Sequence, residues 1–161
     1  MSKELADAFF TVVDESIGWI LECTEGLDTA RLNWRPVEDG NSLHAIANHT
    51  MANAERNILS SYLGKPYAYD RAAEFAAEAK DGDTPLGRRW AELRARIVAG
   101  MAAAGPEAFD RDCDHVRMVR VKGWEVLVQV SRHAAEHVGE ARLTRQLIEA
   151  ASSQRRAPEV P

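Results

Sequence analysis

Residues 131–140, SRHAAEHVGE, give the strongest indication of the fold in this chain. The stretch contains no proline and a single glycine, and its two histidines, His133 and His137, are four residues apart. At about 100° per residue, this spacing places both imidazoles on one face of a helix, about 40° apart. The stretch therefore predicts a helix that presents a histidine pair on one side.

The face that carries the two histidines is also the face expected to pack into a core. Apolar and small side chains recur at helical spacing on both sides of the pair, within about 80° of His133. These residues are Val126, Val130, Ala141, Thr144 and Ile148. The pattern predicts one long helix from Gly123 to about residue 150, with both histidines inside its buried stripe.

Three further helices are predicted before this one, at about 4–24, 41–63 and 84–105. Asn41 or Ser42 would cap the second of them, and Pro85 suits the first turn of the third. The sequence of residues 27–40 indicates turns, residues 72–79 a short helical turn, and residues 115–122 a short strand or an extended loop. With no convincing sheet, we predict an all-α four-helix bundle over residues 1–150, followed by a polar tail at 151–161. The connections before the third and fourth helices are long, so at least one should cross over the bundle.

The composition is that of one ordinary globular domain. The chain has 161 residues, of which 45% are apolar and 28% charged. A net charge of −5 argues against a nucleic-acid partner. No apolar run approaches the roughly 20 residues that span a bilayer, and the start shows no signal-peptide pattern. Cys23 and Cys113 stand far apart without a C-x-x-C motif, so we expect a cytoplasmic protein without disulfides or a membrane partner.

Two buried imidazoles one turn apart cost free energy unless each finds a partner. The pair could share one metal ion, or it could form hydrogen bonds with other side chains or water, and the spacing alone does not separate these interpretations. Residues 133–137 also spell the H-x-x-E-H motif of inverted metalloproteases. We reject that interpretation because the motif is short and those enzymes are far larger. They also take another metal ligand from well downstream of the motif, whereas only 24 residues follow His137.

A metal ion would need a third ligand, and the second helix offers two histidines. His44 and His49 lie about 140° apart on it, and His115 lies in a connection. His49 is more than about 100° from the centre of the clearest apolar stripe of that helix. That stripe consists of Leu43, Ala47, Thr50, Ala54 and Ile58. Periodicity therefore does not choose His49 over His44. His49 could still face a buried site if the helix is buried on two sides, once in its own bundle and once against a second copy.

Several short blocks, taken in order, resemble the DinB/YfiT-like superfamily. They are residues 32–36 (LNWRP), residues 41–43 (NSL), His49 followed by residues 53–56 (NAER), and His133-x-x-x-His137-x-Gly139. The resemblance spans nearly the whole chain. It implies an up-down-down-up four-helix bundle, a homodimer, and a metal site with His49, His133 and His137 as ligands.

The resemblance also limits the function. Some members are transferases or isomerases that use low-molecular-weight thiols such as bacillithiol or mycothiol, and others are described as metal-dependent hydrolases or stress-induced proteins. We therefore expect a metal-dependent thiol S-transferase or a hydrolase that acts on a small molecule. A non-catalytic metal- or ligand-binding bundle of a stress response is the alternative. Three histidines suit Zn²⁺, with Ni²⁺, Fe²⁺ or Mn²⁺ and additional water ligands as alternatives.

Four polar residues near the predicted ligands could assist them. Glu140 and Glu136 flank the histidine pair, and Asn53 and Arg56 follow His49 by one and two turns. A general base or a residue that orients a ligand could be among them. Alternatively, Glu136, Glu140 and Arg56 could be surface residues in ordinary ion pairs. The sequence assigns no catalytic residue.

Overall fold

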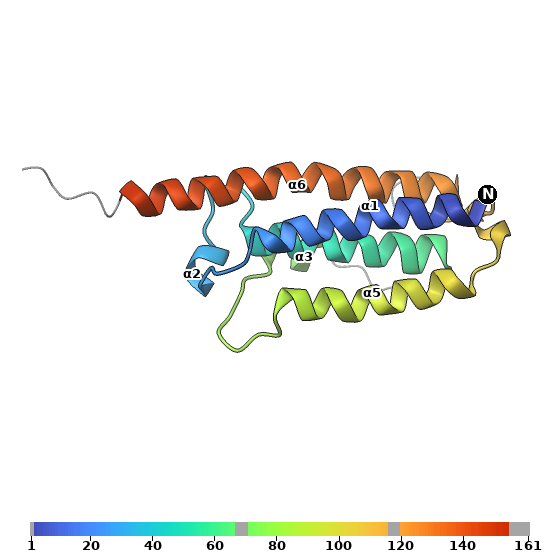
Figure 1. Cartoon of the computed structure of the whole chain (residues 1–161), viewed down its shortest axis with the longest axis horizontal. Helices are drawn as coiled ribbons and strands as arrows, with labels where there is room; N and C mark the ends of the chain where they lie inside the picture. Colours follow the sequence, from blue (N-terminus) through green and yellow to red (C-terminus); the bar gives the residue numbers. More distant parts are fainter. Residues whose placement is uncertain (1, 67–70, 116–119, 155–161) are drawn as a thin grey trace, which may run out of the picture.

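The computed structural model describes residues 2–66, 71–115 and 120–154. Four helical rods lie side by side and make up most of the molecule (Figure 1). They are α1 (Ser2–Glu22), α3 (Leu43–Ala54) continued by the π-helix η1 (Glu55–Tyr62), α5 (Leu86–Ala103) and α6 (Gly123–Gln154). The predicted all-α four-helix bundle is confirmed.

The helices have an up-down-down-up arrangement. In Figure 1, α1 and α6 run in one direction, and α3 and α5 run in the opposite direction. Because α3 and α5 are parallel, the chain between them must return along the length of the bundle, which confirms the predicted crossover. The short helix α4 (Arg71–Ala76) lies on this return and packs against α3.

Short elements fill the connections. A one-turn helix, α2 (Thr29–Leu32), lies where the sequence indicated only turns. Asp28 caps this helix, because its side chain accepts a hydrogen bond from the Arg31 N–H at 2.9 Å. A 3₁₀ turn, η2 (Pro106–Phe109), precedes strand β1 (Asp112–Cys113), which pairs antiparallel with β2 (Val121–Lys122). The predicted strand or loop near 115–122 is thus a two-residue strand at its end, and residues 116–119 lie outside the described part.

One helix boundary agrees with the expected one, and another differs. Ser42, one of the two predicted caps, caps α3, since its side chain accepts a hydrogen bond from the Ala45 N–H at 3.2 Å. Helix α6 continues four residues past the predicted boundary at residue 150, to Gln154. The hydroxyls of Ser152 and Ser153 donate to helix carbonyls one turn earlier, so this last turn is part of the helix. Residues 155–161 of the predicted tail lie outside the described part, and the domain boundary stays a prediction.

The core lies between the four rods. All five stripe residues predicted for the last helix are buried in α6. In α1, apolar side chains recur at helical spacing, namely Leu5, Phe9, Val12, Val13, Ile17 and Ile20. This pattern is wider than the buried face: Leu5 and Val12 are 45% and 42% exposed, whereas Ala6 and Phe10 are buried. The bundle therefore buries a stripe on α1 that is centred between Phe10 and Val13, not every apolar side chain of the pattern.

Helix α3 is buried around its whole circumference. Eleven of its twelve residues are buried, and Ala52 is the exception. Four helices of the same chain, α1, α4, α5 and α6, pack against α3. The second buried side that His49 requires is therefore covered within the same chain. His49 is therefore buried without a second copy of the chain. Its burial no longer supports the predicted homodimer.

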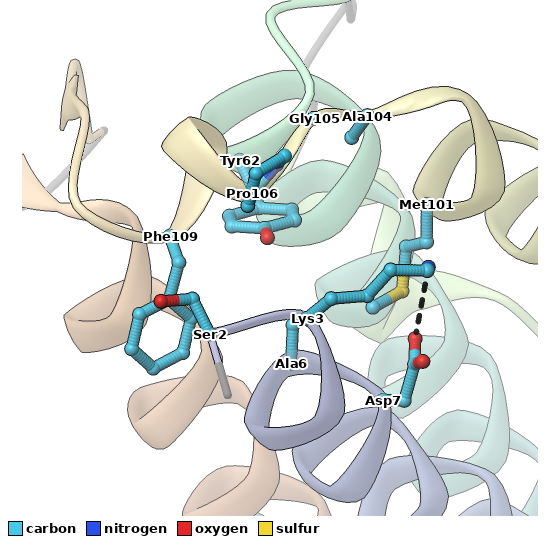
Figure 2. A pocket seen from close by; sticks show the side chains of 10 residues that line it. All are labelled: Ser2, Lys3, Ala6, Asp7, Tyr62, Met101, Ala104, Gly105, Pro106 and Phe109. Carbon is cyan, nitrogen blue, oxygen red and sulfur yellow. Dashed lines mark ion pairs between the residues drawn. The ribbon is translucent and has the colours of Figure 1, made fainter.

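A small cavity of about 10 Å³ lies where α1 begins and η1 ends (Figure 2). Lys3 and Asp7, which form an ion pair at 3.6 Å, line it together with Tyr62 and Phe109. Tyr62 follows His49 by thirteen residues, or roughly 20 Å along a helix. The cavity has room for about one water molecule and is not part of the histidine cluster described below.

Cys23 and Cys113 are free thiols, as predicted. Among the described residues, no helix is both long and apolar enough to cross a membrane.

Candidate metal centre

Three histidines from two helices meet at one point. His49 comes from α3, and His133 and His137 come from α6. Each offers one ring nitrogen, and these three atoms lie within 4.8 Å of one another. The ring centroids of His133 and His137 are 4.5 Å apart, and that of His49 lies 5.0 Å and 5.3 Å from them. The structure thus brings together the three histidines that the resemblance selected.

The cluster extends from the core toward the surface. The His49 side chain is only 4% exposed, whereas that of His137 is 17% exposed. His133 is partly buried. A small molecule could therefore approach the cluster from the side of His137, while the opposite side is closed by packed helices.

The orientation of His49 is set by a carboxylate that the sequence did not predict. Nδ1 of His49 lies 3.0 Å from Oε2 of Glu74, a buried residue of α4. When the carboxylate accepts the Nδ1–H, the lone pair of the imidazole remains on Nε2, which lies 3.2 Å from Nε2 of His133. The other oxygen of Glu74 lies 3.8 Å from Nη1 of the buried Arg56.

A second carboxylate orients His137. Oε2 of Glu140 lies 2.6 Å from Nδ1 of His137, and the Asn41 amide donates to Oε1 at 2.8 Å. The hydrogen bond from His137 lowers the pKa of Glu140 below its usual value; burial opposes this shift, and the bond from Asn41 adds to it. Glu140 is therefore ionised at neutral pH, and Nε2 of His137 is the ring nitrogen left for the cluster.

The arrangement fits a bound divalent ion. Two nitrogens that bind one tetrahedral Zn²⁺ at 2.0–2.1 Å would be about 3.3 Å apart, and Nε2 of His49 and His133 are 3.2 Å apart. Histidine ligands that donate their second N–H to a carboxylate are the usual arrangement in metal sites. Three protein ligands also leave a coordination position for water or substrate. That these histidines bind a metal remains a prediction.

The other two candidate histidines lie elsewhere. Nδ1 of His44 is 3.2 Å from the carbonyl oxygen of Ala77, so this ring contacts the segment that follows α4. His115 is buried and does not belong to the three-histidine group.

Of the four predicted polar neighbours, Glu140 contacts a histidine of the cluster directly. Arg56 forms an ion pair with Glu74, the partner of His49. Glu136 is exposed and forms an ion pair with Arg132 at 3.4 Å, as the surface interpretation expected. Asn53 instead accepts a hydrogen bond from Asn57 at 2.9 Å.

Fold and site together define a four-helix bundle with a three-histidine centre that could hold a divalent ion. Comparison with known protein families assigns this bundle more narrowly. Residues 8–150 match the Mycothiol-S-transferase family, and the chain belongs to that family. The resemblance to DinB-like proteins seen in the sequence is confirmed.

Solved structures share the fold at low sequence identity. YjoA, a DinB-like protein from Bacillus subtilis, is 17% identical with a TM-score of 0.62, and the alignment covers 94% of this chain and 96% of YjoA. A conserved protein from Enterococcus faecalis is 18% identical with a TM-score of 0.59 and coverage of 92% and 95%. YfiT from Bacillus subtilis, described as a probable metal-dependent hydrolase with an unusual four-helix bundle topology, is 19% identical with a TM-score of 0.59 and coverage of 88% and 87%. The comparison with curated proteins found no significant match.

Proposed function

We propose that this protein is a metal-dependent transferase that joins a low-molecular-weight thiol to an electrophilic small molecule. In this reaction a bond forms between the thiol sulfur and the electrophilic carbon, the leaving group departs with its electron pair, and the thiol proton passes to solvent. The convergence of His49, His133 and His137 carries the proposal. The family supplies the thiol class, a mycothiol-like molecule.

The residues of the chain would hold and tune the centre. His49, His133 and His137 each present one nitrogen, and Glu74 and Glu140 hold the second N–H of two of them. The bound ion would lower the pKa of a thiol or a water molecule at its open position toward 7. The partial exposure of His137 lets the thiol approach from the surface, while the buried His49 anchors the centre to the core.

The first test is metal content. Protein purified without added metal or chelator should contain a divalent ion, and His133→Ala should lose it. His115→Ala is the matched control, because it also removes a buried imidazole, one that does not belong to the three-histidine group. A wild-type protein that stays free of metal even when Zn²⁺ is supplied would contradict the proposal.

The second test is turnover. The metal-loaded protein should accelerate conjugation of mycothiol with 1-chloro-2,4-dinitrobenzene, followed by absorbance, and His133→Ala should abolish the acceleration. Equal rates for the two proteins would show that the conjugation does not use this centre.

A hydrolase is the second candidate, because an open metal position can also activate water and YfiT is described as a probable metal-dependent hydrolase. Metal-dependent ester hydrolysis without any thiol would favour it. Bound metal without either activity would favour a non-catalytic bundle. We propose Zn²⁺ as the ion, with Ni²⁺, Fe²⁺ and Mn²⁺ as alternatives that metal analysis distinguishes. Light scattering would test the predicted homodimer.

A further inference from the structure

We infer that Glu74 is a positioning residue of the metal centre, and that it couples metal binding to the docking of helix α4. This inference rests on the proposed function, because it needs His49 to bind a metal ion. Glu74 is 7% exposed, and its carboxylate lies 3.0 Å from Nδ1 of His49. It reaches His49 from a different element, 25 residues further along the chain.

Polar contacts with α3 hold the segment that carries Glu74. The Asn48 amide donates to the backbone carbonyl of Glu74 at 3.0 Å, and Nδ1 of His44 lies 3.2 Å from the carbonyl of Ala77. His44, Asn48 and His49 lie on neighbouring turns of α3, so the segment follows this helix for more than one turn. Its docking therefore depends on a few specific hydrogen bonds, and the bond to His49 is one of them.

The chemistry of the Glu74–His49 pair links the two events. A buried carboxylate is stable only when it is paired, and Glu74 has Arg56 on one oxygen and His49 on the other. A carboxylate that accepts the Nδ1–H makes Nε2 a better metal ligand, and a metal-bound imidazole is a stronger donor to the carboxylate. By thermodynamic linkage, the factor by which docked Glu74 raises metal affinity equals the factor by which bound metal favours docking.

Glu140 cannot have the same role. It lies three residues from His137 on the same helix, and its side chain is 36% exposed. Its hydrogen bond to His137 therefore orients a ring within α6 but does not connect α6 to α4. Of these two carboxylates, only that of Glu74 links the histidine cluster to the crossover.

The test compares Glu74→Gln with the control Glu78→Gln. Glutamine keeps the size of Glu74 and removes its charge. Glu78 is an exposed residue just beyond α4. Zn²⁺ affinity is measured by competition with a chelating indicator, and amide hydrogen exchange of residues 71–79 is measured with and without Zn²⁺. Removing such a partner of a metal ligand typically weakens binding by about 10- to 100-fold.

We expect Glu74→Gln to weaken Zn²⁺ binding within that range, while Glu78→Gln binds like the wild type. In the wild type, Zn²⁺ should slow exchange in residues 71–79, and in Glu74→Gln this slowing should be lost. A purely structural role for Glu74 would change exchange in the absence of metal but not Zn²⁺ affinity.

Each failure has a separate meaning. If the wild type does not bind Zn²⁺, the proposed function and this inference both fail. If the wild type binds Zn²⁺ and Glu74→Gln binds it equally tightly, the metal centre stands and the inference is overturned. If Glu74→Gln does not fold, the wild-type exchange experiment still decides, because unchanged exchange in residues 71–79 on Zn²⁺ binding would exclude the coupling.

Discussion

Replacing Asn33 with alanine should loosen the crossover that leads back to α5. The Asn33 amide bonds both backbone groups of Ala79: Nδ2 donates to its carbonyl at 2.9 Å, and the Ala79 N–H donates to Oδ1 at 2.7 Å. Each bond contributes about 0.5–1.5 kcal/mol net, so Asn33→Ala should lower the free energy of unfolding by about 1–3 kcal/mol. For a domain of this length the melting temperature should fall by about 2–12 °C.

Thermal and urea unfolding followed by circular dichroism would measure this loss on the metal-free protein, so the result does not depend on the proposed centre. Val37→Ala is the control, because Val37 lies in the same connection as Asn33 and is 65% exposed. Its effect should stay within about 0.5 kcal/mol. If Asn33→Ala is as stable as the control, the side-chain bonds to Ala79 do not hold the crossover, and the reasoning is refuted.

Three other predictions concern the bundle. Ile97→Ala should cost about 2–5 kcal/mol in urea unfolding because Ile97 is fully buried in α5, whereas its exposed neighbour Val98→Ala should have little effect; similar losses would contradict the packing. Gly123→Ala should cost about 1–3 kcal/mol, because the new Cβ would collide with the backbone carbonyl of Ala108; an unchanged melting temperature would rule out that close approach. Burial raises the pKa of Tyr62 above its usual value of 10.0. The neutral phenol therefore stabilises the fold below pH 10.0, and this contribution is lost as the pH rises through the pKa that Tyr62 has in the folded protein. The ultraviolet titration step that Tyr62→Phe removes should therefore lie above pH 10; a step below it would contradict the burial.

Helical periodicity was sufficient to predict the bundle and one part of the site. In α6 the same repeat that marks the core places His133 and His137 side by side, so their proximity follows from spacing alone. In α3 the apolar repeat does not predict which residues face the site, because a helix that is buried on every side has no single apolar face. The choice of His49 over His44 therefore came from the resemblance to a family and not from the pattern.

Glu74 could not be predicted from local sequence. It lies in a six-residue helix within a long crossover, and its contact with His49 exists only because the crossover returns along α3. The exposure of Leu5 and Val12 also depends on the three-dimensional arrangement, because the width of an apolar stripe on a helix does not predict how much of the stripe neighbouring helices cover. Contacts set by the path of the chain need the three-dimensional structure.

The parallel course of α1 and α6 has a practical consequence for protein engineering. The start of α1 and the end of α6 lie at opposite ends of the molecule (Figure 1). Ser2 and Gln154, the residues at these two helix ends, are therefore separated by about the length of α6, whose 32 residues span roughly 48 Å. A circular permutant would need a linker of about 14 fully extended residues to join these two positions. Conversely, fluorophores attached near Ser2 and Gln154 would report on the full length of the bundle in energy-transfer experiments.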